Sequence, residues 1–397
     1  MSQKLNEQMV SGLPLFRLAF RPFFWFGTLF GVVSISLWAL AFSGLLQFAP
    51  LGGGFFWHTH EMLFGFTAAI ISGFLLTAVQ TWTGVPSIKG LPLAALFLLW
   101  LAARVLLIFP TWVGVGVTQV VDLLFLPVAA IALLIPIAKV KQWRNLMFVP
   151  ILLFMACLNG VMHLSIVGKL AVSFITISHI MVLMVCVVMC IIGGRVFPMF
   201  TANGTGTPRV APISWLEKLS IWSVVAAVVV TIPAIDLPAN LKAMVYLVAG
   251  LANLARAWRW RIWVTFRTHL VWPLHLAYWS ICIGLVMLSL QQWQILNSKS
   301  IAIHAITVGG ISWMVLSMIA RVSLGHTGRK ILVGWVMALA FIFMGLAFMV
   351  RVFVPLVFEY STHVVLASSA FWVAAMVIFL MRYVPVLFTT RVDGKPG

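Results

Sequence analysis

Histidines are the residues of this sequence best suited to chemistry, because a neutral imidazole is a common metal ligand. Nine occur among the 397 residues. Six of them map to the outer third of predicted membrane helices, where each ring nitrogen needs a partner. These metal-ligand candidates are His58, His60, His163, His179, His304 and His363. A hydrogen bond between helices satisfies such a ring equally well, so both interpretations stay open.

His58 and His60 lie at the start of one predicted helix. Two residues correspond to roughly 200° of helical rotation, so only one of the two rings is expected to face the interior. The face below His58 is formed by Met62, Gly65, Ala69 and Ser72. Because small residues would let a flat macrocycle lie against the helix, we predict that His58 is an axial ligand. Close packing between helices would favour the same small residues.

Charged side chains within predicted helices are a second group of candidates, because charges at membrane depth are costly and usually face partners in the bundle. Arg104 and Asp122 are predicted at similar depths on neighbouring helices and could pair, either for packing alone or as part of a site. Glu61 is a candidate hydrogen-bond acceptor, proton relay or interfacial carboxylate. The remaining polar-site candidates are Arg195, Arg321, His326 and Arg351.

The composition requires a membrane around these residues. Apolar residues make up 63% of the chain and charged residues only 8%, the reverse of a soluble domain. The net charge of +18 is scattered between apolar runs, so nucleic acid is not the expected partner. All four cysteines fall inside predicted helices, which argues against a disulfide framework. No nucleotide-binding loop or nucleophile elbow of soluble enzymes is present.

Apolar runs of about 20 residues predict an all-α protein with about twelve transmembrane helices. We expect a cytoplasmic segment 1–22, a single membrane domain 23–383 and a cytoplasmic tail 384–397. The predicted helices are 23–45, 58–80, 91–109, 115–138, 147–165, 171–194, 216–235, 240–257, 271–291, 299–321, 331–350 and 361–383. The first is interpreted as a retained helix rather than a removed signal peptide.

The basic residues predict the orientation, because cytoplasmic loops are enriched in lysine and arginine. The loops and chain ends on one side of the twelve predicted helices carry about twenty lysines and arginines, including Arg144 and Arg261. The other side carries Lys169, Lys242, Lys299 and Arg351. We therefore expect both termini in the cytoplasm.

Three of the histidines recur at a regular spacing along the chain, which indicates a weak internal repeat. His58, His179 and His304 are separated by about 120 residues, or four predicted helices each time. Arginine followed by valine closes the second and third of these helices, at Arg195 and Arg321. The pattern suggests three four-helix units. Both Arg321–Arg329 and Thr201–Gly204 are interpreted as polar loop segments beneath the helices.

Four segments in conserved order resemble the NnrS family of haem- and copper-containing membrane proteins. They are Arg17-Leu-Ala-Phe-Arg-Pro-Phe-Phe24, Trp57-His-Thr-His-Glu-Met62, Gly193-Gly-Arg-Val-Phe-Pro-Met-Phe-Thr201, and His304 with Arg321-Val-Ser-Leu-Gly-His-Thr-Gly-Arg329. The resemblance implies haem of b type, copper, the bacterial inner membrane and a role in the nitric oxide response. The architecture also looks like the catalytic subunit of haem-copper reductases, although the second histidine of helix ten and the histidine pair of helix seven are missing.

These observations lead to two hypotheses of different class. The first is a protein that binds, senses or detoxifies nitric oxide, with redox turnover and an electron donor as open questions. Haem would then lie in the outer half of the membrane, with its propionates near Arg104 or Arg351. The alternative is a transporter of a metal or small metabolite.

Overall fold

The computed structural model describes residues 12–359 and 361–395, and these residues form helices with no strand among them. Three short 3₁₀ turns and three π-helical segments accompany the α-helices. The α-helices are α2 (Phe20–Phe42), α3 (Gly53–His60), α4 (Ala68–Thr83), α5 (Leu91–Ile108), α6 (Val115–Lys139), α7 (Trp143–Leu146), α8 (Phe148–Ile166), α9 (Phe174–Thr205), α10 (Ser214–Thr231), α11 (Ala239–Arg259), α12 (Trp272–Gln292), α13 (Lys299–His304), α14 (Trp313–His326), α15 (Trp335–Phe348), α16 (Val354–Val357) and α17 (Thr362–Leu387). The all-α prediction is confirmed.

Eleven helical runs among the described residues are long and apolar enough to cross a membrane. The predicted span that is not among these eleven is 240–257. It corresponds to α11, which has 21 residues but falls short of that composition. The positions of the two chain ends indicate whether α11 also crosses the membrane. Near the start of α2, Arg21 donates hydrogen bonds from Nη1 to the carbonyl oxygens of Leu387 and Thr389, at 2.8 and 2.7 Å. Because both ends meet on one side, the number of crossings is even, which supports α11 as the twelfth.

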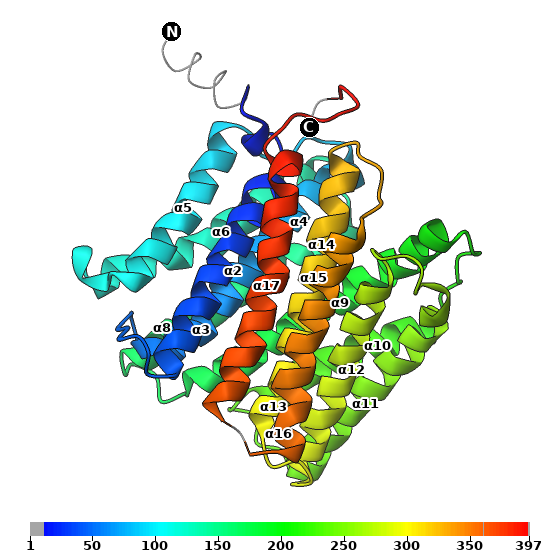
Figure 1. Cartoon of the computed structure of the whole chain (residues 1–397). Helices are drawn as coiled ribbons and strands as arrows, with labels where there is room; N and C mark the ends of the chain where they lie inside the picture. The colour runs from blue at the N-terminus through cyan, green and yellow to red at the C-terminus, as the bar shows by residue number, and fades with distance from the viewer. Residues whose placement is uncertain (1–11, 360, 396–397) are drawn as a thin grey trace. The chain divides into compact units, whose positions relative to one another are not determined.

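The described chain divides into two compact units. The first contains residues 12–175, 322–330 and 380–395, and so brings together α2 to α8 and the last turns of α14 and α17. In Figure 1 the blue start of α2 and the red end of α17 lie at the same end of this unit. Its core is aromatic: the Phe23 ring meets the rings of Phe97, Trp100 and Phe125 at 5.7 to 6.2 Å.

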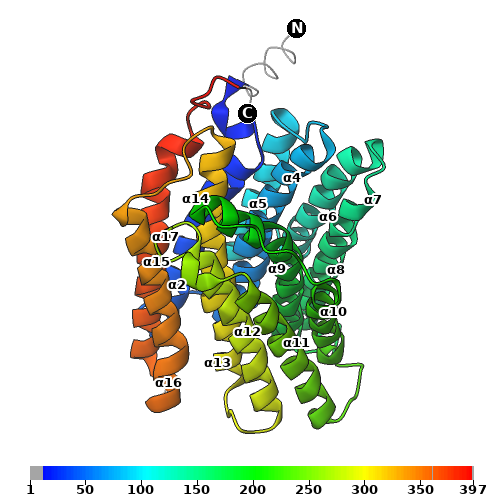
Figure 2. The ribbon, with the colours of Figure 1, turned by 90° about the vertical axis from the view of Figure 1, so that its right-hand side faces the viewer.

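The second unit contains residues 176–321, 331–359 and 361–379. Helices α10, α11 and α12 pack in sequence order as antiparallel neighbours, joined by short connections (Figure 2). Glycines let these helices approach closely, since a Cβ on Gly250 would lie 2.7 Å from a methyl of Val286. Two buried polar residues of α11 link it to its neighbours: Arg256 contacts Cys190 of α9, and Asn253 contacts Tyr278 of α12.

Several predicted helix ends differ from the structure, and two of them change the interpretation of polar segments. Helix α9 continues to Thr205, past the expected end at 194, and α14 continues to His326 instead of ending at 321. Thr201–Gly204 and the first part of Arg321–Arg329 are therefore helical rather than loop. Gly194 lies inside α9 and serves packing there, because a Cβ on it would collide with the Arg256 guanidinium.

The three π-helical segments are Glu61–Thr67, Ala305–Ser312 and Met349–Phe353. Such segments are rare in helices and are often found at functional sites. The first begins directly after His60 and the second directly after His304. Each of these histidines therefore sits where the regular α-helix changes its winding.

Candidate metal centre

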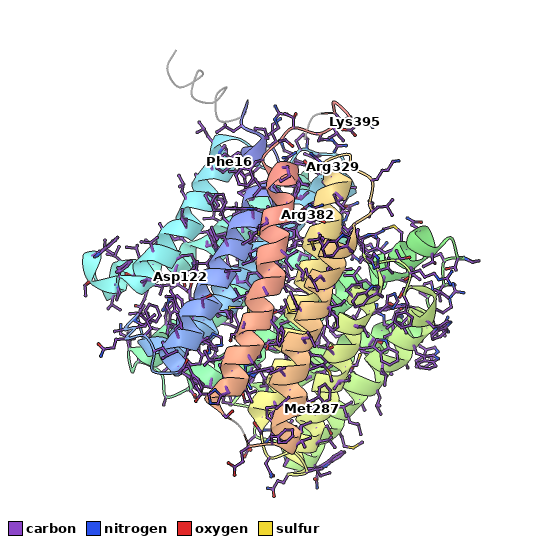
Figure 3. All side chains as sticks on the ribbon, in the orientation of Figure 1. Phe16, Asp122, Met287, Arg329, Arg382 and Lys395 are labelled. Carbon is purple, nitrogen blue, oxygen red and sulfur yellow. The ribbon has the colours of Figure 1, made fainter. Side chains whose placement is uncertain are left out.

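Six polar side chains from five helical elements meet in the interior of the first unit. His60 ends α3, Glu61 begins the π-helical segment, Arg104 comes from α5 and Asp122 from α6, and α8 contributes two more residues. We call this set the buried polar cluster: His60, Glu61, Arg104, Asp122, Asn159 and His163, each at most 3% exposed. Figure 3 labels Asp122 on α6, well away from the end of the unit that carries Arg329 and Lys395.

Pairs of residues four positions apart in the sequence place side chains of the cluster on one face of a helix. Asn159 and His163 are four residues apart, so they share one face of α8. Trp100 and Arg104 share one face of α5 in the same way, and the Trp100 indole donates a 2.9 Å hydrogen bond to the carbonyl oxygen of Gly65. That glycine leaves room for the cluster, because a Cβ on it would lie 2.8 Å from Arg104 Nη1.

Arg104 joins the two carboxylates of the cluster. Its Nη1 donates to both oxygens of Glu61, at 2.7 and 2.8 Å, and its Nη2 donates to Asp122 Oδ1. The predicted pairing of Arg104 with Asp122 is confirmed. Two carboxylates against one guanidinium leave an excess of one negative charge, and an uncompensated charge is costly in such an environment. A proton on an imidazole or a bound cation would offset it.

The other oxygen of Asp122 faces both histidines. Asp122 Oδ2 lies 2.9 Å from His163 Nε2 and 3.1 Å from His60 Nε2, and it accepts a 2.8 Å hydrogen bond from Asn159 Nδ2. The side-chain oxygen of Asn159 lies 2.8 Å from His60 Nε2. On its far side, His60 places Nδ1 2.7 Å from Glu61 Oε1. Both nitrogens of His60 therefore meet polar oxygens.

Three of these groups have the spacing of metal ligands. One atom each from His60, Asp122 and His163 lies within 4.8 Å of the others. Two imidazoles and a carboxylate suit copper, iron or zinc. The Glu61 contact to His60 Nδ1 is the carboxylate–histidine arrangement that fixes the orientation of a ligating ring. The donor set therefore fits a transition-metal ion.

Comparison with known families matches residues 14–391 to the family described as NnrS protein. The chain belongs to the NnrS family. Membership covers nearly the whole chain and supports a membrane protein of the nitric oxide response. No curated protein matches the chain at the significance required of a relative.

Outside the buried polar cluster, His304 of this NnrS protein has hydrogen-bond contacts at both ring nitrogens. His304 Nδ1 lies 2.7 Å from the carbonyl oxygen of Ser300, one turn earlier in α13. Its Nε2 lies 3.3 Å from Arg351 Nη2. A carbonyl accepts but cannot donate, so Nδ1 carries the hydrogen and the lone pair of Nε2 is directed away from α13. His304 directly precedes one π-helical segment of the second unit, and Arg351 lies within another.

The remaining predicted histidines occupy different surroundings. His58 stacks on Trp38, with ring centroids 4.5 Å apart and planes inclined by 12°. His179 lies on α9, and its buried Nδ1 has no hydrogen-bond partner among the described residues. His363 is exposed near the start of α17. The structure thus brings His60 and His163 together, and leaves His58 outside that cluster.

Most of the other polar candidates lie outside the buried polar cluster and in different places from one another. Arg195 is half-buried on α9. Arg321 lies over the Phe200 ring, 4.0 Å from its centroid. His326 ends α14, where its carbonyl oxygen accepts a 2.9 Å hydrogen bond from Arg391 Nη1. Of the two arginines predicted near propionates, Arg104 already holds both carboxylates of the cluster, whereas Arg351 lies beside a histidine.

Two buried polar features were missed by sequence reasoning. Asn159 was not a candidate, although its position four residues before His163 was a usable signal. The other is a group in the second unit around Arg256, which pairs with Glu217 and donates to the Cys190 carbonyl oxygen at 2.9 Å. Tyr278 donates a 2.5 Å hydrogen bond to Asn253 Oδ1 in the same group. We call Cys190, Glu217, Asn253, Arg256 and Tyr278 the arginine cluster.

Proposed function

We propose that this NnrS protein is a metal-binding membrane protein of the nitric oxide response, with its metal ion held by His60, Asp122 and His163. The observation that supports it most is the convergence of three donor atoms within 4.8 Å in a cluster with an excess negative charge. A cation would offset that charge. Copper is the metal we propose, because it binds nitrogen donors most tightly among the common divalent metals and the family resemblance implies it.

The neighbouring residues would prepare this site. Glu61 would hold the His60 ring through Nδ1, and Asn159 would orient the Asp122 carboxylate. Arg104 would keep both carboxylates ionised and in place. Bound copper would supply a redox-active centre that can bind nitric oxide. Because nitric oxide is small, neutral and soluble in lipid, it could reach a site between membrane helices without a polar channel.

Copper content of the purified protein tests this proposal. We expect His163→Ala and Asp122→Asn to lose copper, because each removes a ligand. His363→Ala is the matched control, since His363 is exposed and outside the cluster, and it should retain the copper content of the wild type. Gel filtration and helical circular dichroism check folding. Unchanged copper in both cluster variants, with the fold intact, would exclude this site.

Haem is the second part of the proposal, and His304 supports it. A hydrogen bond from Nδ1 to a carbonyl oxygen fixes the orientation of a ligating histidine ring. A haem iron at Nε2 would take the place of the present contact with Arg351 Nη2. The nearby Arg351 is a guanidinium of the kind that pairs with a propionate. The sequence-based prediction that His58 is an axial ligand stays a prediction.

The Soret absorption distinguishes these haem ligands. We expect His304→Ala to lose or shift the band, while His363→Ala leaves it unchanged. Replacing His58 and His60 separately tests the earlier prediction, in which His58→Ala has the larger spectral effect. A wild-type spectrum for His304→Ala would remove His304 as a ligand.

For orientation, we propose that both termini face the cytoplasm across a bacterial inner membrane. The proposal rests on the basic residues in the loops, and the Arg21 contacts to the end of α17 are compatible with it. Reporter fusions at the C-terminus and near Arg144 and Arg261 should all give a cytoplasmic signal. A transporter of a metal or small metabolite remains the alternative.

A further inference from the structure

A cavity in the second unit lies apart from every residue of the proposed metal sites. It is lined by α9 around Gly194 and Pro198, by residues 209–213 of the connection that follows, by the first turn of α10 and by the last turn of α11. Helices α9, α10 and α11 can be followed in Figure 2. The charged residues of the lining are Arg209, Glu217, Arg256 and Arg259. Three arginines against one glutamate leave two uncompensated positive charges.

The three arginines of the cavity differ in how many of their N–H groups already form hydrogen bonds or ion pairs within the protein. Arg256 pairs with Glu217, although its buried Nε has no hydrogen-bond partner among the described residues. Arg259 donates one hydrogen bond, 3.0 Å from Nη2 to the carbonyl oxygen of Ala211. Arg209 forms no hydrogen bond or ion pair with any described residue. Since a guanidinium has five N–H donors, Arg209 and Arg259 retain most of theirs for a ligand.

The start of α10 adds to the positive potential. Its first turn lines the cavity through Leu216 and Glu217, and no side chain caps it. Uncapped N–H groups and the helix dipole favour an anion at such a terminus. The cavity thus combines two available guanidinium groups with a helix start, and phosphate is the anion that this combination suits best.

Exposed tryptophans place the cavity at the level of lipid headgroups. Trp215 is 64% exposed and directly precedes the lining residue Leu216, and Trp258 is 58% exposed beside Arg259. Trp263, 49% exposed, packs against Trp258 with ring centroids 5.3 Å apart. Tryptophan is enriched at both membrane–water interfaces. A phosphate at this depth belongs to a lipid more readily than to a soluble molecule.

We propose that this cavity binds the phosphate of an anionic lipid headgroup, with Arg209 and Arg259 as its principal ligands. Arg256 would contribute its charge, and the first turn of α10 its N–H groups. Loop residues 206–213 would be held by the lipid together with two existing contacts, from Arg259 to Ala211 and from Arg261 Nη2 to the Pro208 carbonyl oxygen at 2.6 Å. The site is independent of metal binding.

Thermal unfolding of the full-length protein in neutral detergent tests the proposal. Phosphatidylglycerol, phosphatidylcholine or inorganic phosphate is added to wild type, to Arg209→Gln and to Arg209→Gln/Arg259→Gln. We expect phosphatidylglycerol to raise the Tm of the wild type saturably, and its apparent affinity to fall about tenfold or more in the double variant. Arg267→Gln, an exposed arginine outside the cavity, is the matched control and should respond like the wild type.

Each outcome decides the proposal. Arg209→Gln removes no hydrogen bond or ion pair with a described residue, so its loss of response cannot be attributed to misfolding. An equal phosphatidylglycerol response in the wild type and double variant would overturn the site. If inorganic phosphate alone gave the full response, the ligand would be a soluble phosphate and the lipid would be the wrong source. A response to phosphatidylcholine of the same size would contradict recognition of an anionic lipid.

Discussion

The buried polar cluster of the first unit and the arginine cluster of the second share one plan. In each, a buried arginine pairs with a glutamate and lies against a helical glycine. A Cβ on Gly65 would crowd Arg104, and a Cβ on Gly194 would crowd Arg256. The glycine lets a guanidinium enter between packed helices, where a larger residue would occupy its place.

The two clusters differ in the other groups that contact the arginine besides its glutamate. Arg104 also holds Asp122, and this second carboxylate faces the imidazoles of His60 and His163. Arg256 meets neutral groups instead, including the Tyr278 hydroxyl at 3.2 Å. Only the first cluster therefore has an excess negative charge and nitrogen donors. A buried arginine alone does not indicate a site; the charge balance and the donor types around it do.

The largest effect is expected when either arginine is replaced by methionine. Arg104→Met leaves two buried carboxylates without their cation, which should lower the free energy of unfolding by roughly 3–5 kcal/mol. Arg256→Met should cost less, about 1–3 kcal/mol, because the Glu217 side chain is 25% exposed and can be hydrated. Chemical denaturation in detergent measures both. A larger loss for Arg256→Met would reverse the proposed ranking of the clusters.

A smaller effect is expected when each glycine becomes alanine. The new Cβ of Gly194→Ala would collide with Arg256 Nη2, and that of Gly65→Ala would lie 2.7 Å from Phe30 Cε1 and 2.8 Å from Arg104 Nη1. Overpacking of this kind typically costs about 1–3 kcal/mol. Copper content separates the two variants, because only Gly65→Ala should reduce it. Equal copper loss in both would show that the readout reports folding and not the metal centre.

The smallest effect is expected at the exposed pair of Arg391 and Asp393. The Arg391 guanidinium holds the pKa of the Asp393 carboxyl below its usual range. A lowered carboxyl pKa contributes stability above the unfolded value, and that contribution is lost only as the pH falls towards the folded value. Asp393→Asn should therefore leave the Tm unchanged between pH 5 and 8, because exposed pairs contribute little. A marked loss of Tm would show that burial is not what separates these three arginines.

Some of the site could be predicted from the sequence. Charges within apolar runs must find partners, so Arg104 and Asp122 could be paired from their predicted depths alone. His60 and His163 were candidates for the same reason. The choice of His58 over His60 assumed a regular helix with small residues as a slot. In the structure Gly65 packs against Phe30, Glu61 and Arg104, while the His58 ring lies on Trp38.

Hydrophobicity determined the helices of this protein, because its long apolar runs have few ways to avoid water. The tertiary structure decided which polar groups meet. The π-helical segment after His60, the extension of α9 to Thr205 and the contact of Asn159 with Asp122 all depend on neighbouring helices. The physical reason is that a chain in lipid must bury each polar group against a specific partner, and only the packing of helices distant in sequence supplies that partner.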